Sequence, residues 1–214
     1  MNRRNVLQQL GALALLASPV GLVLGQHSAH GHSQGSFQVL PSKVQTNTPD
    51  KIEVLEFFHY GCSHCHNLDP LIAQWAGRLP NDVVFMRVPV IWGKQHKGFA
   101  RLYYTLLVTK RLDLHETIFT AVQKQQMRLD NPNIVREWAK ANRLDVSAFM
   151  NAYESFGVNT QVERAEKLTA SYRIESVPTI AVDGRFLTSA SMAGTHEAAL
   201  KVVDDLIERI RKGE

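Results

Sequence analysis

The sequence predicts a mixed α/β fold in which a β-sheet domain is interrupted by an all-helical insertion. Strand-like segments at both ends of the chain bracket a block of about 75 residues whose patterns are helical. Before that block the order is strand, helix, strand, which is typical of a parallel βαβ unit. The 214 residues are 44% hydrophobic and 21% charged, so they supply enough apolar material for a sizeable core.

Residues 1–25 have the composition of a signal peptide. Arg3 and Arg4 form a basic start, and an uncharged, leucine-rich stretch follows over residues 6–25. Glycine and proline interrupt this stretch, which favours a cleaved leader over a membrane anchor. We therefore expect the protein to be exported.

Residues 26–36 are small and polar, with three histidines among serine and glycine, and predict a flexible linker. Without residues 1–25, the 24 basic residues of the chain fall to 22 against 20 acidic ones. This scattered, nearly neutral charge gives no reason to expect a nucleic-acid partner.

The remaining elements follow from the hydrophobic pattern. Strands are expected at residues 37–40, 52–58, 83–88, 179–182 and 186–187. Helices are expected at residues 67–79, 99–108, 134–141, 146–153, 160–172 and 196–210. Turn residues at 48–50 and Asp183-Gly184 separate strands. We expect one domain from residues 37–94 and 173–214, and a helical insertion over residues 95–172.

The two cysteines of the chain, Cys62 and Cys65, lie where a strand gives way to a helix. At a helix N-terminus, backbone N–H groups and the helix dipole stabilise a thiolate, so Cys62 is the expected reactive sulfur. A thiolate of low pKa is also a good leaving group, so the pair can give its disulfide to substrate thiols. His64, between the two cysteines, could strengthen this effect.

The chain carries residues 54–58 followed by the Cys62-Ser63-His64-Cys65 motif, and further along Val158-Asn159-Thr160, Val177-Pro178-Thr179 and Asp183-Gly184-Arg185-Phe186. Together these motifs resemble those of the DsbA family of bacterial periplasmic disulfide oxidoreductases. The resemblance implies a thioredoxin-like fold with an inserted helical domain in the periplasm. It also implies disulfide donation to newly exported proteins that contain cysteines, and reoxidation by a quinone-linked membrane protein of the DsbB type.

The same resemblance implies roles for further residues. Glu56 matches a buried acid that exchanges a proton with the inner cysteine, and a buried carboxylate among apolar neighbours requires such a role or a partner. Pro178 matches a cis-proline beside the active site, and the backbone at Val177 pairs with an extended substrate peptide. Tyr60 is expected to contact substrate. Ser63 stands where many members have proline, so we expect reduced potency or altered substrate preference.

Other interpretations of the cysteine pair remain open. Cys-x-x-Cys followed by His66 is also the attachment signature of c-type haem, and the same three residues could hold zinc. The pair could be a structural disulfide in a binding module. Within the redox class, the protein could be a reductase or an isomerase, because direction depends on relative potential. We expect no cofactor, no metal and a monomer.

Overall fold

The structure is a computed structural model that describes residues 33–213. The predicted signal peptide and residues 26–32 of the predicted linker lie outside the described residues. Residues 33–36 of that linker instead form strand β1 (Ser33–Gln34) and the turn into β2 (Phe37–Val39), which pairs with β1 in antiparallel fashion. Strand β1 has only two residues and both are polar, so no alternation of apolar and polar residues marks it in the sequence.

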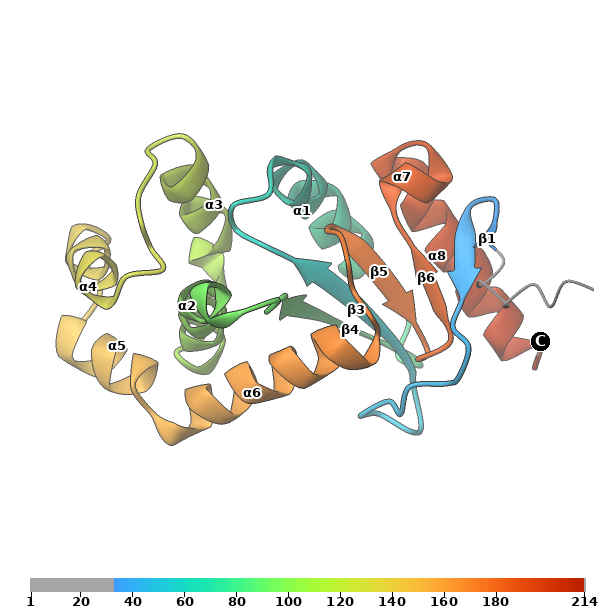
Figure 1. Ribbon diagram of the computed structural model, residues 1–214, viewed down its shortest axis with the longest axis horizontal. Coiled ribbons are helices and arrows are strands. Elements are labelled where there is room, and N and C mark those ends of the chain that lie inside the picture. The colour runs from blue at the N-terminus through green and yellow to red at the C-terminus, as the bar shows by residue number, and fades with distance from the viewer. Residues whose placement is uncertain (1–32, 214) are drawn as a thin grey trace, which may run out of the picture. The chain divides into compact units, whose positions relative to one another are not determined.

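The described strands form a six-stranded sheet in the order β1-β2-β6-β5-β3-β4 (Figure 1). Its longer members are β3 (Ile52–Phe58), β4 (Val83–Pro89), β5 (Thr179–Val182) and β6 (Phe186–Thr188). Strand β3 pairs in parallel with β4 and in antiparallel fashion with β5, so segments far apart in the sequence become neighbours. The predicted parallel βαβ unit is confirmed.

The stretch between β4 and β5 contains helices and no strand, which confirms the expected helical insertion. The helices are α1 (Ser63–Ala76), α2 (Lys97–Val108), α3 (His115–Gln123), α4 (Pro132–Ala141), α5 (Val146–Tyr153), α6 (Phe156–Ser171), α7 (Ala190–Ala193) and α8 (His196–Arg211). Helices α3 and α7 were not predicted. None of the helices described is both long and apolar enough to cross a membrane.

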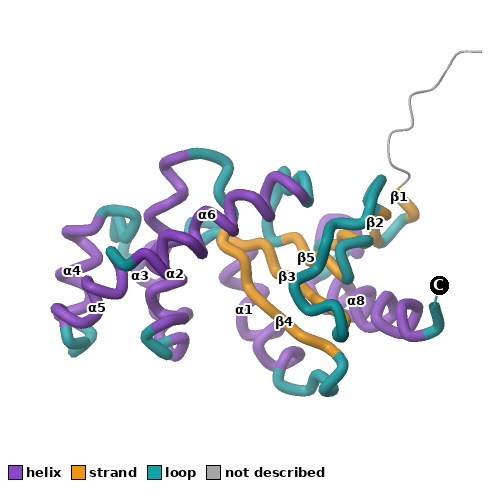
Figure 2. The backbone as a smooth tube through the Cα atoms, turned by 90° about the horizontal axis from the view of Figure 1, so that it is seen from below, coloured by secondary structure: helices purple, strands orange, loops and turns teal. Residues whose placement is uncertain are grey.

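Two hydrophobic clusters hold the sheet between helices. Figure 2 shows α1 and α8 on one side of the sheet and α6 on the other. Because side chains alternate along a strand, Val54 of β3 packs into the cluster with α1 and α8, whereas Leu55 and Phe57 join the cluster with the helical insertion. The same alternation places Glu56 on the side of α1.

The turn between β5 and β6 requires glycine. Gly184 has a φ of +67°, and a Cβ there would lie 2.0 Å from the backbone oxygen of Val44. The N–H group of Val44 donates to the oxygen of Gly184 at 2.8 Å, which ties the segment before β3 to this hairpin. Both the backbone conformation and the close approach therefore exclude a side chain.

Candidate active site

Cys62 and Cys65 occupy the start of helix α1, directly after the loop that follows β3. Cys62 is the N-cap residue, and its sulfur accepts the N–H of Cys65 at 3.4 Å. The helix therefore begins at Ser63, four residues before the predicted start at Asn67. Cys65 is fully buried, Cys62 is half-buried, and both are free thiols. This arrangement leaves Cys62 as the accessible sulfur.

The two sulfurs differ in acidity. The pKa of Cys62 is lowered to about 6, mainly by a side-chain hydrogen bond with Cys65 and further by the N–H groups of Cys65 and His64 and the charge of His64. Burial opposes this shift. The same hydrogen bond, together with burial, raises the pKa of Cys65 far above that of an ordinary thiol. Near neutral pH the first proton therefore leaves Cys62.

The loop before β5 faces this sulfur. The peptide bond between Val177 and Pro178 is cis, as predicted, and the thiol of Cys62 donates to the oxygen of Val177 at 3.4 Å. Beside them lies a cavity of about 560 Å³ between the start of α1, this loop and the α7–α8 segment. Its lining residues are His64, Ser176, Val177, Pro178, Ala190, Ser191, Gly194, Thr195, His196 and Glu197. The exposed side chain of His64 thus forms part of the cavity wall next to Cys62.

Glu56 is buried beneath α1, with 1% of its surface exposed. Arg87, its partner in the β3–β4 register, donates from Nε to Oε2 of Glu56 at 3.0 Å and from Nη2 to Oδ1 of Asp69 at 2.7 Å. Burial raises the pKa of Glu56 to about 7; Arg87 opposes this rise and Asp69 adds to it. The charge of Glu56 also contributes to the raised pKa of Cys65.

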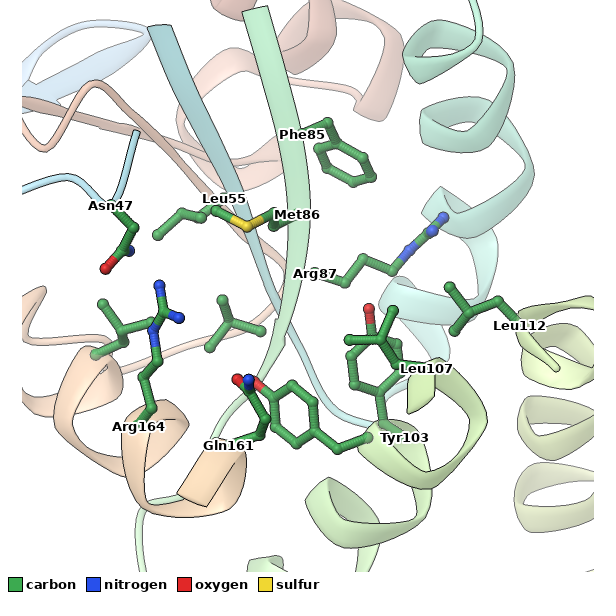
Figure 3. Close-up of a pocket in the computed structure, with 13 residues that line it drawn as sticks. Asn47, Leu55, Phe85, Met86, Arg87, Tyr103, Leu107, Leu112, Gln161 and Arg164 are labelled. Atoms are coloured by element: carbon green, nitrogen blue, oxygen red, sulfur yellow. The ribbon is translucent and has the colours of Figure 1, made fainter. Parts of the chain in front are cut away.

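Arg87 and Asp69 were not identified from the sequence. An arginine within the apolar segment 83–88 was the available signal, because it falls opposite Glu56 if the two strands pair in parallel. Figure 3 shows Phe85 and Arg87 on one side of β4 and Met86 on the other. Arg87 thereby reaches the acid on β3 and the acid on α1 together.

Tyr60 does not lie on the surface, and its predicted role as a substrate contact is wrong. Its side chain is fully buried, and its hydroxyl lies 2.7 Å from Nδ1 of His115. Its ring packs against Phe119, with centroids 4.9 Å apart. The loop turns this side chain toward the helical insertion, because an aromatic ring gains more from burial there than from exposure.

His66, the third residue of the haem and zinc alternatives, packs against helix α3. Its ring stacks on Phe119 with centroids 5.1 Å apart and planes at 4°, and its Nε2 lies 3.6 Å from Oε1 of Glu116. Within residues 33–213, no group of three or more His, Cys, Asp or Glu side chains is arranged to hold a metal ion.

A second cavity of about 280 Å³ lies between β4 and helices α2 and α6 (Figure 3). Its lining residues are Asn47, Leu55, Phe85, Met86, Arg87, Val88, Tyr103, Tyr104, Leu107, Leu112, Gln161, Arg164 and Leu168. Neither cysteine is among them, so this cavity is separate from the thiol site.

The site combines a Cys-x-x-Cys pair at a helix N-terminus with a cis-proline loop that faces the outer sulfur. The outer thiol has a lowered pKa and the inner thiol a raised one. Together with the sheet behind the helix, these features define a thiol:disulfide oxidoreductase of thioredoxin-like fold. Comparisons with known proteins agree. Residues 72–201 match the family model described as the DSBA-like thioredoxin domain, and the chain belongs to this family.

Relatives and solved structures support the assignment. The chain is 44% identical over 170 residues to the thiol:disulfide interchange protein DsbA of Bordetella parapertussis, covering 79% of this chain and 81% of that protein. It is 34% identical over 204 residues to DsbA of Pseudomonas aeruginosa, covering 94% and 95%. A crystal structure of that DsbA matches with a TM-score of 0.80 over 84% of this chain and 94% of the other. The protein is therefore a disulfide-forming oxidoreductase of thioredoxin-like fold.

Proposed function

We propose that the Cys62–Cys65 disulfide is donated to newly exported proteins through Cys62 as the exchanging sulfur. The observation that carries this proposal is the asymmetry of the pair: a half-buried Cys62 with a pKa of about 6 beside a buried Cys65 of much higher pKa. A sulfur that is stable as a thiolate is the better leaving group, which favours release of the disulfide to a client.

The transfer takes place in two exchanges. A client thiolate attacks Cys62 of the oxidised pair; the bond between client and Cys62 forms, the Cys62–Cys65 bond breaks, and its electron pair goes to Cys65. A second client thiolate then attacks the client sulfur of the mixed disulfide and expels Cys62 as a thiolate. The client loses two electrons as its disulfide forms, and the cysteine pair gains them.

Glu56 handles the proton at Cys65 in this scheme. When Cys65 leaves as a thiolate of high pKa it requires a proton at once, and a carboxyl group with a pKa of about 7 holds or releases one near neutral pH. Burial raises the pKa of this acid, and Arg87, which bonds both Glu56 and Asp69, positions it and opposes part of that rise.

The cavity beside Val177 and Pro178 is the site where the client peptide lies. The Val177 backbone faces Cys62 and can pair with an extended peptide, which recognises clients without reading their side chains. His64 is a catalytic residue at the edge of this cavity, where its charge favours the Cys62 thiolate. Unfolded proteins that contain cysteines fit such a site.

The setting of the reaction follows from the family and the leader sequence. The signal peptide at residues 1–25 directs the protein to the periplasm and is then removed, and residues 26–32 of the predicted 26–36 linker precede the folded part. Residues 37–94 and 173–214 form the thioredoxin-like domain, and residues 95–172 form the insertion. A quinone-linked membrane protein of the DsbB type reoxidises the pair, and the protein acts as a monomer.

A trapping experiment tests the scheme. In a reduced Cys65→Ser variant, the free thiolate is Cys62, and an equimolar amount of an unfolded peptide is added whose one cysteine is activated as a mixed disulfide with 2-nitro-5-thiobenzoate. Cys62 attacks the peptide sulfur and expels thionitrobenzoate as the better leaving group. We expect a stable mixed disulfide between protein and peptide on a non-reducing gel, because neither partner then holds a free thiol to resolve it. A Cys62→Ser variant treated in the same way is the control. Absence of the adduct in the Cys65→Ser sample would contradict exchange at Cys62.

A further inference from the structure

The loop that carries Cys62 receives two hydrogen bonds from the helical insertion. Gln123, the last residue of α3, donates from Nε2 to the backbone oxygen of Tyr60 at 2.9 Å and to that of Cys62 at 3.0 Å. A primary amide has two N–H donors, so each carbonyl receives one. The reversed amide would place its oxygen against two carbonyl oxygens, so the chemistry of the contact fixes its orientation.

These bonds meet the backbone where α1 begins. The carbonyl of Cys62 also accepts the N–H of His66 at 3.2 Å, which starts the helix, and its second lone pair is used by Gln123. The N–H groups of His64 and Cys65, which stabilise charge on the Cys62 sulfur, belong to this same first turn. The direction in which these N–H groups point toward the Cys62 sulfur depends on how the preceding loop joins the first turn of α1.

Helix α3 also contacts side chains on both sides of the cysteine pair. Its Phe119 packs on Tyr60, before the pair, and stacks on His66, after it. These ring contacts hold side chains, whereas the amide of Gln123 holds the backbone itself. The side chain of Gln123 is half-buried, so water competes weakly for these hydrogen bonds.

We propose that Gln123 is a positioning residue that holds the carbonyl groups of Tyr60 and Cys62 and thereby fixes the Cys62 sulfur at the N-terminus of α1. It bonds to backbone oxygens, so it acts on the sulfur through the loop. The inference rests on the thiolate mechanism proposed above. In this way a residue of the helical insertion influences the acidity of Cys62 and the redox equilibrium of the cysteine pair.

Two variants and a matched control test this role. Gln123→Ala removes both donors, and Gln123→Glu keeps the size but offers two acceptor oxygens and a negative charge to the carbonyls. Gln125→Ala removes the same type of side chain from an exposed position two residues further on. For each reduced protein, the pH midpoint of thiolate formation is read from ultraviolet absorbance, and the equilibrium with glutathione is measured separately.

Both Gln123 variants are expected to raise the pH midpoint of Cys62, with Gln123→Glu giving the larger rise. The equilibrium constant for reduction by glutathione should fall about threefold to tenfold, because the reduced form loses part of its thiolate stabilisation. Gln125→Ala should match the wild-type protein in both measurements.

Folded Gln123 variants with a wild-type midpoint and equilibrium constant would overturn the proposal, even if they unfolded at lower urea concentration. If Gln123→Ala does not fold, the nearly isosteric Gln123→Glu variant decides the matter by the same two readouts. A wild-type midpoint near that of a free cysteine would overturn the thiolate mechanism and this inference with it. A low wild-type midpoint that the variants share would overturn only the role of Gln123.

Discussion

Replacing Glu56 by glutamine should stabilise the protein, and by an amount that depends on pH. The folded protein holds the carboxyl group of Glu56 in a buried site, where its pKa rises from 4.5 to about 7. Between these two pH values the folded state binds more protons than the unfolded state. The free energy of unfolding contributed by this group therefore falls as the pH rises through that window.

The size of the effect follows from the two pKa values. A tenfold change in acidity corresponds to about 1.4 kcal/mol, so the charged carboxylate destabilises the folded state by about 3 kcal/mol above pH 7. Glutamine resembles the protonated acid in size and charge. We therefore expect Glu56→Gln to match the wild-type protein near pH 4 and to exceed its free energy of unfolding by about 3 kcal/mol at pH 8.

Urea unfolding of the reduced proteins at several pH values measures this difference. Glu175→Gln removes the same charge from an exposed position and controls for the change in net charge. A gain that is equal at pH 4 and pH 8 would refute the linkage argument, because the cause would then be packing and not the cost of a buried charge. A loss of stability at pH 8 would show that the bond to Arg87 outweighs burial.

Two further predictions concern residues around the site. Tyr60→Phe should lower the free energy of unfolding by about 1–3 kcal/mol, because Nδ1 of His115 loses its buried partner. Alkylation of Cys62 in this variant should proceed at the wild-type rate. A slower rate would contradict the purely structural role of the Tyr60 hydroxyl. Gly184→Ala should lower the free energy of unfolding, measured in urea, by more than about 2 kcal/mol. Alanine would have to adopt the left-handed backbone conformation of Gly184, and its Cβ would clash with the Val44 oxygen. A decrease below about 0.5 kcal/mol would show that the turn adapts at little cost.

The sheet and the position of the cysteine pair could be predicted because their signals are local. The apolar run 52–58 matches β3 in full, and the turn at Asp183-Gly184 separates β5 from β6 as expected. The start of α1 was placed too late because no apolar periodicity begins before Leu68. The N-cap function of Cys62, which is a property of its sulfur in the folded chain, sets the true start.

The surroundings of the site depend on contacts between distant residues, and these were mostly missed. Arg87 becomes a partner of Glu56 only through strand pairing, and Gln123 reaches the loop across more than sixty positions of sequence. Tyr60 was expected to contact substrate because the sequence gives no sign of His115 as its buried partner. Glu56 and Pro178 were identified because family motifs mark them.

The equilibrium of the purified protein with glutathione tests the central claim most directly, since it gives the reduction potential of the Cys62–Cys65 pair. If Cys62 is a stabilised thiolate that donates its disulfide, the potential should be more oxidising than about −200 mV, toward the general reference value of about −120 mV for DsbA. A potential near the value of about −270 mV for thioredoxin would contradict disulfide donation and indicate a reductase.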